Sequence, residues 1–367
     1  MLHLFGFSPA KKSSTANEQA AAEFCTARIL SFLSTKELIT TGQLVSHQWK
    51  DFIDKTFAEP INTLLVHTTM GPFFKAQPTD RQLTSVKLLP GGLTNKTLLI
   101  TTADKRKFVA RHPGSGSGLF VDRVCESGNV RIAASLGVTP EVLFENPQGS
   151  RITQFLDQPL PMSSELLKVE ENIYHVVAVM KKTHTSSQRF ENDINVFDRN
   201  RVMLKILADK HTSLPDDYTY ATTVINQIEE TIKKMPVTTA PCHNDTTPGN
   251  FILSNGKMYL IDLEYSGNND PLWDLVNLSM EAEFNKEQDQ LLLEAYYDKV
   301  DEETLTRFNL YKPVVEYWVA LWAQVQISNR NYADGLETLQ LMERKRFLNC
   351  LGLLEGIVSP NPRGPSL

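Results

Sequence analysis

The sequence predicts a mixed α+β chain with a short helical unit, a small β-rich lobe and a larger, mainly helical lobe. Alternating and β-branched residues at 97–101 and 107–111 predict a hairpin around a polar turn. Later in the chain, Trp318 and Trp322 stand four residues apart and share one helical face. The expected parts are a mobile tail at 1–17, a helical domain at 18–62, a β-rich lobe at 63–157 and a helical lobe at 158–367.

Length and composition are those of an ordinary globular protein. The 367 residues allow two or three domains, and 41% apolar with 22% charged residues argues against a disordered or fibrous chain. A net charge of −6 disfavours a general binder of nucleic acid or anionic membrane, because such binding depends on clustered Lys and Arg. No apolar run approaches the roughly 20 residues of a membrane span. We therefore expect a soluble, cytoplasmic protein that binds neither partner.

The four cysteines, Cys25, Cys125, Cys242 and Cys350, are scattered without a paired motif. This spacing indicates neither a disulfide framework nor a structural zinc site, and it fits a reducing compartment. Cys242 stands next to His243, and the two could be read as a nucleophile and its base. The residues that follow them give a better explanation, set out below.

Residues 20–57 contain short helical pieces, with an N-cap signal at Ser34-Thr35. This segment resembles an F-box, although Phe24-Cys25 replaces the Leu-Pro that usually opens that motif. The resemblance implies docking on the Skp adaptor of a cullin-type ubiquitin ligase. The partner-binding residues it implies are Ile29, Leu30, Leu33, Leu38, Leu44, Val45 and Trp49. The alternative is a helical cap packed on the next domain.

The loop before the hairpin contains adjacent glycines, Gly91 and Gly92, followed by Thr94 and Asn95. Glycines permit a close backbone approach, so amide groups or the Thr94 hydroxyl could meet phosphate oxygens. Taken alone, a Gly-Gly turn in a hairpin usually serves only the turn. The functional interpretation therefore depends on the residues that follow.

A helix near Val121–Leu136 follows the hairpin and is expected to turn Glu126 toward Arg111, at the end of the second strand. A cation on a strand that is held by a carboxylate on the next helix can be aimed at ATP phosphates. Residues beyond this helix predict two edge strands around a turn at Asn146–Gly149. These pieces complete the β-rich lobe.

The strongest pattern places His243, Asp245 and Asn250 in the order H-x-D-x-x-x-x-N, with Asp262 after a short Asn-Gly hairpin. Phosphoryl transfer needs a carboxylate at the acceptor hydroxyl and oxygen ligands that hold magnesium against the nucleotide phosphates. The five residues from Asp245 to Asn250 let one loop serve both purposes. Asp262 supplies a second carboxylate from the neighbouring strand.

In residues 83–350 the chain resembles the choline/ethanolamine kinase and aminoglycoside phosphotransferase superfamily, whose two-lobed fold is protein-kinase-like. The resemblance implies that ATP and Mg²⁺ are used. It also implies that Asp245 is the catalytic base, that Asn250 and Asp262 are magnesium ligands, and that His243 organises the loop. Arg111 is implied to bind phosphate with Glu126 as its partner. The alternative is a pseudokinase that keeps the fold as a binding platform.

The run after Asp262 points within that superfamily to choline and ethanolamine kinases. Asp274 and Asn277 are expected to begin a helix and to tie the loops together. Aromatic faces with a nearby carboxylate recognise a quaternary ammonium. The substrate-binding candidates are Glu264, Glu281, Trp318, Trp322 and Tyr332. A core stripe of aromatic residues and an exposed helical Glu281 are the alternatives. The candidate amines are choline, ethanolamine, thiamine and an aminoglycoside-like polyamine.

Two functions follow from the sequence. The first is ATP- and Mg²⁺-dependent phosphorylation of a small cationic alcohol, with choline as the first choice. The second is a ubiquitin-ligase adaptor whose kinase-like lobe recruits a target. If the chain comes from a bacterium, the F-box-like segment would make it an effector in the cytosol of a host cell.

Overall fold

The computed structural model describes residues 59–76, 83–89, 95–114, 121–330 and 335–358. The predicted tail and the F-box-like positions Ile29, Leu30, Leu33, Leu38, Leu44, Val45 and Trp49 lie outside these ranges, as do Gly91, Gly92, Thr94 and Tyr332. No helix in the described part of the chain is both long and apolar enough to cross a bilayer.

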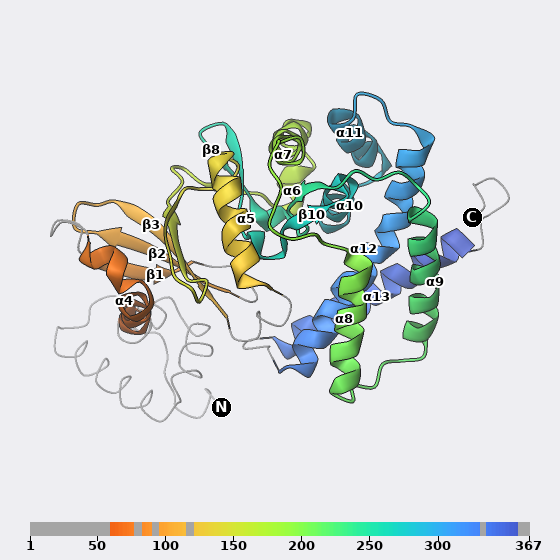
Figure 1. Cartoon of the computed structure of the whole chain (residues 1–367), viewed down its shortest axis with the longest axis horizontal. Helices are drawn as coiled ribbons and strands as arrows, with labels where there is room; N and C mark the ends of the chain where they lie inside the picture. Colours follow the sequence, from red (N-terminus) through yellow and green to blue (C-terminus); the bar gives the residue numbers. More distant parts are fainter. Residues whose placement is uncertain (1–58, 77–82, 90–94, 115–120, 331–334, 359–367) are drawn as a thin grey trace, which may run out of the picture.

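The N-terminal lobe is built on a five-stranded antiparallel sheet of order β1-β2-β3-β5-β4 (Figure 1). Its strands are β1 (Leu83–Leu88), β2 (Asn95–Thr102), β3 (Lys107–Pro113), β4 (Val142–Glu145) and β5 (Arg151–Gln154). The predicted hairpin is β2 and β3. The prediction of two edge strands is wrong for β5, because it pairs with β3 on one side and β4 on the other. Its fully buried Ile152 suits an interior strand.

Two helices cover the sheet, and each joins a different core. α4 (Glu59–Lys75) packs on β1 and β4, where its buried Val66 and Met70 meet Leu98 and Ile100 in a small core. This helix runs across residue 62, which is the predicted end of the helical domain at 18–62. α5 (Arg123–Ser135) contributes to the large core of the second lobe, so it connects the lobes.

The C-terminal lobe is mainly helical and lies to the right of the sheet in Figure 1. Its helices are α6 (Ser164–Leu167), α7 (Glu170–His184), α8 (Val196–Asp209), α9 (Asp217–Ile232), α10 (Pro271–Glu281), α11 (Lys286–Tyr296), α12 (Glu302–Ser328) and α13 (Leu336–Val358). α12 is its longest helix among the described residues, and most of its length is buried against α8, α10 and α13. The α+β class and the kinase-like division into a β-rich and a helical lobe are thus confirmed.

Short strands at the base of the helical lobe carry the predicted motif. They are β6 (Leu160–Pro161), β8 (Phe251–Ser254) and β9 (Lys257–Leu260) in one sheet, and β7 (Ala240–Cys242) and β10 (Gly267–Asn269) in another. The loop after β7 and the 3-10 turn η6 (Pro248–Asn250) contain the H-x-D-x-x-x-x-N residues. Asp262 precedes a second 3-10 turn, η7 (Leu263–Tyr265). Pairing of β7 with β10 therefore brings the two halves of the motif together.

Gly267 is the close-packed position in this pairing, opposite Cys242. A Cβ atom there would come within 2.3 Å of the Ile194 side chain and 3.0 Å of the Asn192 carbonyl oxygen. We expect Gly267→Ala to lower the free energy of unfolding by about 1–3 kcal/mol, because backbone limits how far the neighbours can shift.

Urea denaturation measures this change. The matched control is Gly352→Ala on α13, where a Cβ meets nothing within 4 Å, so the free energy of unfolding should stay level or rise. Equal stability of the Gly267→Ala variant and the unaltered chain would contradict the close packing.

Candidate active site

His243 ties the motif loop to the end of β9. Its Nε2 donates to the Ile261 carbonyl at 2.7 Å, and its Nδ1 accepts from the Asp245 backbone N–H at 3.3 Å. Both ring nitrogens are thereby used, and the bonds select the Nε2-protonated tautomer. These contacts place Asp245 beside the segment that carries Asp262, which is what a loop-organising His243 requires.

Asp274, fully buried on α10, holds the same loop from behind. Its two carboxylate oxygens accept from the backbone N–H groups of His243 and Asn244, at 2.8 and 2.7 Å. Thr246 adds bonds to the Asp274 carbonyl at 2.7 Å and to the Asn277 side chain at 3.0 Å. The predicted tie between these helix residues and the loop is present, and charge-assisted bonds in a buried setting make it strong.

Two residues of the site adopt left-handed backbone conformations, Asn244 with φ 65° and Asp262 with φ 61°. Asn is among the residues that tolerate this region best. The Asn244 side chain donates to the Tyr265 carbonyl at 3.1 Å and accepts from Asn269 at 2.9 Å, which compensates the local strain. Strain of this kind gathers at functional sites, where the surrounding structure fixes it.

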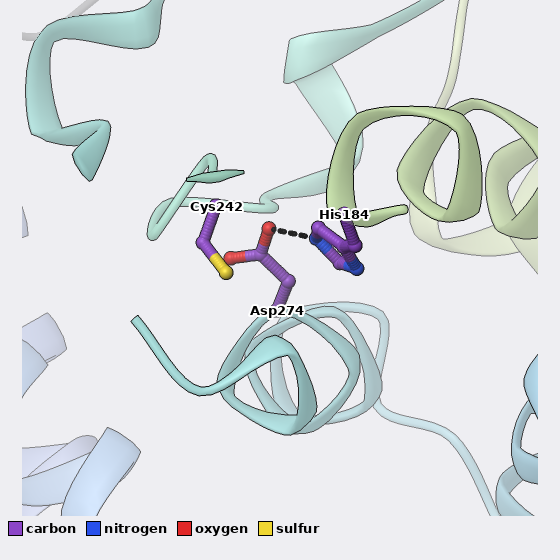
Figure 2. A group of neighbouring side chains, drawn as sticks. All are labelled: His184, Cys242 and Asp274. Carbon is purple, nitrogen blue, oxygen red and sulfur yellow. Dashed lines mark hydrogen bonds and ion pairs between the residues drawn. The ribbon is translucent and has the colours of Figure 1, made fainter. Parts of the chain in front are cut away.

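His184, Cys242 and Asp274 form a buried group whose possible ligand atoms all lie within 4.8 Å of one another (Figure 2). His184 contacts the Asp274 carboxylate at 3.0 Å and the Tyr296 hydroxyl at 2.8 Å. Since Asp274 also holds two amides, hydrogen bonds already satisfy these groups, and we interpret the cluster as a clamp and not as a metal centre.

The nucleophile interpretation of Cys242 and His243 is excluded by their positions. Burial, together with Asp274 and Asp270, raises the pKa of the Cys242 thiol well above its usual value. Its Sγ is turned to the Asn269 carbonyl oxygen, 3.5 Å away. An inert, protonated thiol results.

Arg111 joins the two lobes through three carboxylates. It donates to Glu126 at 2.7 Å, as predicted, and also to Asp262 at 2.6 Å and to Glu264 at 2.7 Å. Burial alone would lower the pKa of Arg111, but Asp262, Glu126 and Glu264 raise it above its usual value. The guanidinium therefore stays charged where the lobes meet, beside the expected magnesium ligand Asp262.

Sequence reasoning missed two further arginines of this network. Arg123 pairs with Glu126 from one turn earlier in α5, a spacing that the sequence does contain. Arg151 lies opposite Arg111 in the β3–β5 register and contacts Glu126 at 3.4 Å. Only knowledge of the strand pairing could have found Arg151. Burial raises the pKa of Glu126, but Arg111, Arg151 and Arg123 together lower it below its usual value.

Asn95 and Glu264 meet each other across the lobes. The Asn95 amide donates to Glu264 Oε2 at 3.1 Å, and both side chains are buried. From the sequence, Asn95 is expected to bind phosphate and Glu264 to bind the acceptor. In the structure Glu264 faces Arg111 and Asn95, on the side of the N-terminal lobe.

The residues of the expected metal site supply hard oxygen donors. Asn250 uses its amide nitrogen on the Asp245 carbonyl at 2.8 Å and on the Asp245 carboxylate at 3.3 Å, and these bonds do not consume its Oδ1. Burial raises the pKa of Asp245 well above its usual value, and Asp262, Glu281 and Glu264 raise it further. Such a surplus of carboxylates suits a divalent cation, so Asn250 and Asp262 fit Mg²⁺.

Glu281, at the end of α10, is half-buried and belongs to an ion-pair group. Arg346 on α13 donates to Glu281 at 2.7 Å and to Glu316 on α12 at 3.2 Å. The alternative of an exposed helical Glu281 is therefore wrong. Burial raises the pKa of Glu281 although Arg346 opposes the shift. Two carboxylates and one guanidinium leave this group with a net charge near −1 when all are ionised.

Both tryptophans that were predicted to bind the substrate contact the Tyr265 side chain. Trp322 donates its indole N–H to the Tyr265 hydroxyl at 3.1 Å, and Trp318 packs edge-on against the same ring at a centroid distance of 5.6 Å. Trp318 is only 8% exposed and Trp322 is half-buried. Trp318 thus contributes mainly to the core, while Trp322 keeps part of its ring exposed.

Comparison with known proteins gives matches over the same region. The family model described as Choline/ethanolamine kinase matches residues 86–318. Protein LicA of Haemophilus influenzae is 30% identical over 223 residues, which cover 60% of this chain and 65% of that protein.

Solved structures show the same architecture. A choline/ethanolamine kinase family protein from Mesorhizobium loti has a TM-score of 0.66 and 29% identity, covering 77% of this chain and 93% of that one. Choline kinase LicA from Streptococcus pneumoniae has a TM-score of 0.68 over 81% of this chain and 99% of that one. Its identity of 21% makes the second likeness evidence of the fold alone.

The Asp274 clamp can be tested by Asp274→Asn. The new amide would turn a donor toward the N–H of His243 or Asn244, so we expect the free energy of unfolding to fall by about 1–3 kcal/mol. Hydrogen exchange at these two amides should accelerate. Cys242→Ala, the control within the same cluster, should leave both exchange rates near their original values. Unchanged exchange in Asp274→Asn would reject the clamp.

Proposed function

The chain belongs to the choline/ethanolamine kinase family, and from this premise we propose that it transfers the γ-phosphoryl group of ATP to the hydroxyl of a small cationic alcohol, choline first. The observation that carries the proposal is the meeting of Arg111, Asp262 and Glu264 across the lobes, where Asp262 and Glu264 also raise the pKa of Asp245. Phosphoryl transfer depends mainly on positioning and on stabilising charge, which is what such a group of residues provides.

Asp245 is the proposed base. It would orient the acceptor hydroxyl and take its proton as the phosphoryl group arrives. The backbone bond to His243 and the amide of Asn250 fix its position. Asn250 and Asp262 would hold Mg²⁺, which neutralises charge on the nucleotide phosphates when it is bound.

Arg111 is proposed to bind phosphate oxygens from the N-terminal lobe. Glu126 holds one side of its guanidinium, and Glu264 contacts the other. We therefore propose that Glu264 positions Arg111 and does not touch the acceptor. Asn95 supports Glu264 in this arrangement.

The cationic end of the acceptor is proposed to lie toward Glu281 and the aromatic wall at Trp322. The net negative charge of the Glu281 group supports this placement, and aromatic faces attract a weakly hydrated cation. Trp318 would act from behind the wall, through Tyr265. The likeness to choline kinases supports choline as the first substrate to test.

Replacement of the proposed base gives the direct test. We expect Asp245→Asn to lower kcat with ATP, Mg²⁺ and choline by about 100- to 10,000-fold, because no group then accepts the hydroxyl proton. Binding of ATP should be nearly unchanged. The matched control is Asp209→Asn on the exposed end of α8, which pairs only with Lys205 among the described residues and should keep full turnover.

Two results would count against the proposal. Full turnover by Asp245→Asn would reject the base. Binding of ATP without phosphorylation of any amino alcohol by the unaltered chain would favour a kinase-like binding protein over an enzyme.

A second proposal concerns the F-box-like segment at 18–62, and it is supported by the residue pattern alone. We propose that this segment binds a Skp-type adaptor. In a pull-down with purified adaptor, the full chain should be retained, and a variant with Leu33→Ala and Trp49→Ala should not. Failure of the unaltered chain to bind removes the adaptor role and leaves the kinase proposal untouched.

A further inference from the structure

Among the described residues, Arg199 on α8 has no carboxylate partner. Seven arginines in the described ranges are buried or half-buried, and six of them pair with a carboxylate: Arg106, Arg111, Arg123, Arg151, Arg307 and Arg346. Arg199 is the exception among these residues: its guanidinium lies over the Tyr265 ring, 5.5 Å from the centroid. Burial lowers its pKa below the usual value, so the charge is held at a cost.

Its surroundings place Arg199 at the wall of the proposed active site. The Tyr265 ring beneath it follows Asp262 and Glu264 in the chain, and its hydroxyl accepts the Trp322 N–H. α8 packs on α12, the helix that carries that tryptophan. Tyr265 is within electrostatic range of both Asp245 and Arg199: burial raises the pKa of its phenol, Glu264 and Asp245 raise it further, and Arg199 opposes them.

The position matters because a cation–π contact offsets only part of the desolvation of a guanidinium. Arg199 is half-buried, so part of its side chain stays open to solvent. A carboxylate or phosphate would complete the pair with short, charge-assisted hydrogen bonds. A purely cationic ligand against this part of the wall would instead meet a like charge.

We propose that Arg199 forms an anion subsite of the acceptor pocket, so that the preferred acceptor is a zwitterionic alcohol with a carboxylate or phosphate in addition to its cationic nitrogen. The inference rests on the proposed phosphotransfer, and it ranks zwitterionic alcohols above purely cationic ones such as choline. The Glu281 group, with a net charge near −1, would take the cationic nitrogen, and Arg199 would take the anion. Asp245 is within electrostatic range of Glu281 and Tyr265, which is consistent with a hydroxyl held near both.

Matched substrate pairs test this idea with the full chain, ATP and Mg²⁺. Ethanolamine and L-serine differ by one carboxylate, so this pair tests a carboxylate as the anion. Choline and glycerophosphocholine differ by a glycerophosphate group, so this pair tests a phosphate. We expect at least one of the two zwitterions to have a kcat/KM about tenfold or more above that of its cationic partner. A charge-assisted hydrogen bond between Arg199 and the anion allows a difference of this size. Arg199→Met should abolish that advantage, chiefly through KM, and Arg199→Lys should restore part of it.

The control is Arg201→Met, two residues along α8, where an exposed guanidinium pairs with Asp198 and Glu229. It should leave both ratios unchanged. Equal use of both members of each pair, unaffected by Arg199→Met, would overturn the subsite.

A binding measurement separates this inference from the proposed function. Titration with L-serine and glycerophosphocholine, followed by tryptophan fluorescence, reports on the wall that contains Trp322. Binding that disappears in Arg199→Met, without turnover of any alcohol, would keep the anion subsite and reject the phosphotransfer. Turnover of choline without any effect of Arg199→Met on the binding of L-serine or glycerophosphocholine would keep the phosphotransfer and reject the anion subsite.

Discussion

The buried carboxylate of Asp274 is the constraint on which the site depends. It accepts two consecutive backbone amides of the motif loop, and His184 on α7 holds it from the other side. A loop with a left-handed Asn244 would otherwise relax, since its backbone donors would be unsatisfied in a dry interior. Because the clamp and the β7–β10 pairing act together, Asp245 and Asp262 come from rigid neighbours and not from independent loops.

The second constraint is the charge network around Arg111, which connects the lobes. Glu126 belongs to α5, whereas Asp262 and Glu264 belong to the helical lobe, and one guanidinium binds all three. A buried ion pair by itself is weak evidence of stability, because desolvation can equal the attraction. Its value here is geometric: the fork of donors fixes the distance between the lobes at the place where a nucleotide is expected. Arg123 and Arg151 keep the acidic side of the network from accumulating negative charge.

Sequence reasoning succeeded where local patterns carry the information. The β2–β3 hairpin, the helix that bears Glu126 and the short hairpin before Asp262 follow from alternation, turn residues and spacing. It failed where the answer depends on strand register or on packing between distant helices. The interior position of β5, the place of Arg151 opposite Arg111 and the pairing of Glu281 with Arg346 all belong to this second class. No local pattern distinguishes an exposed glutamate on a helix from one that a later helix covers.

The contrast between local patterns and packing explains why sequence motifs do not identify Arg199 as a site residue. Motifs name residues that contact ATP and metal, and the cation among them is compensated before any ligand arrives, because three carboxylates surround Arg111. Within the part of the chain that the structure describes, Arg199 is compensated only by the π-face of Tyr265, so its charge can gain more from a ligand than that of Arg111. Because a pocket discriminates by the difference between bound and unbound pairing, the least compensated charge has the largest effect on substrate choice. On this reasoning the family motif sets the reaction, and α8, which lies outside that motif, sets the acceptor.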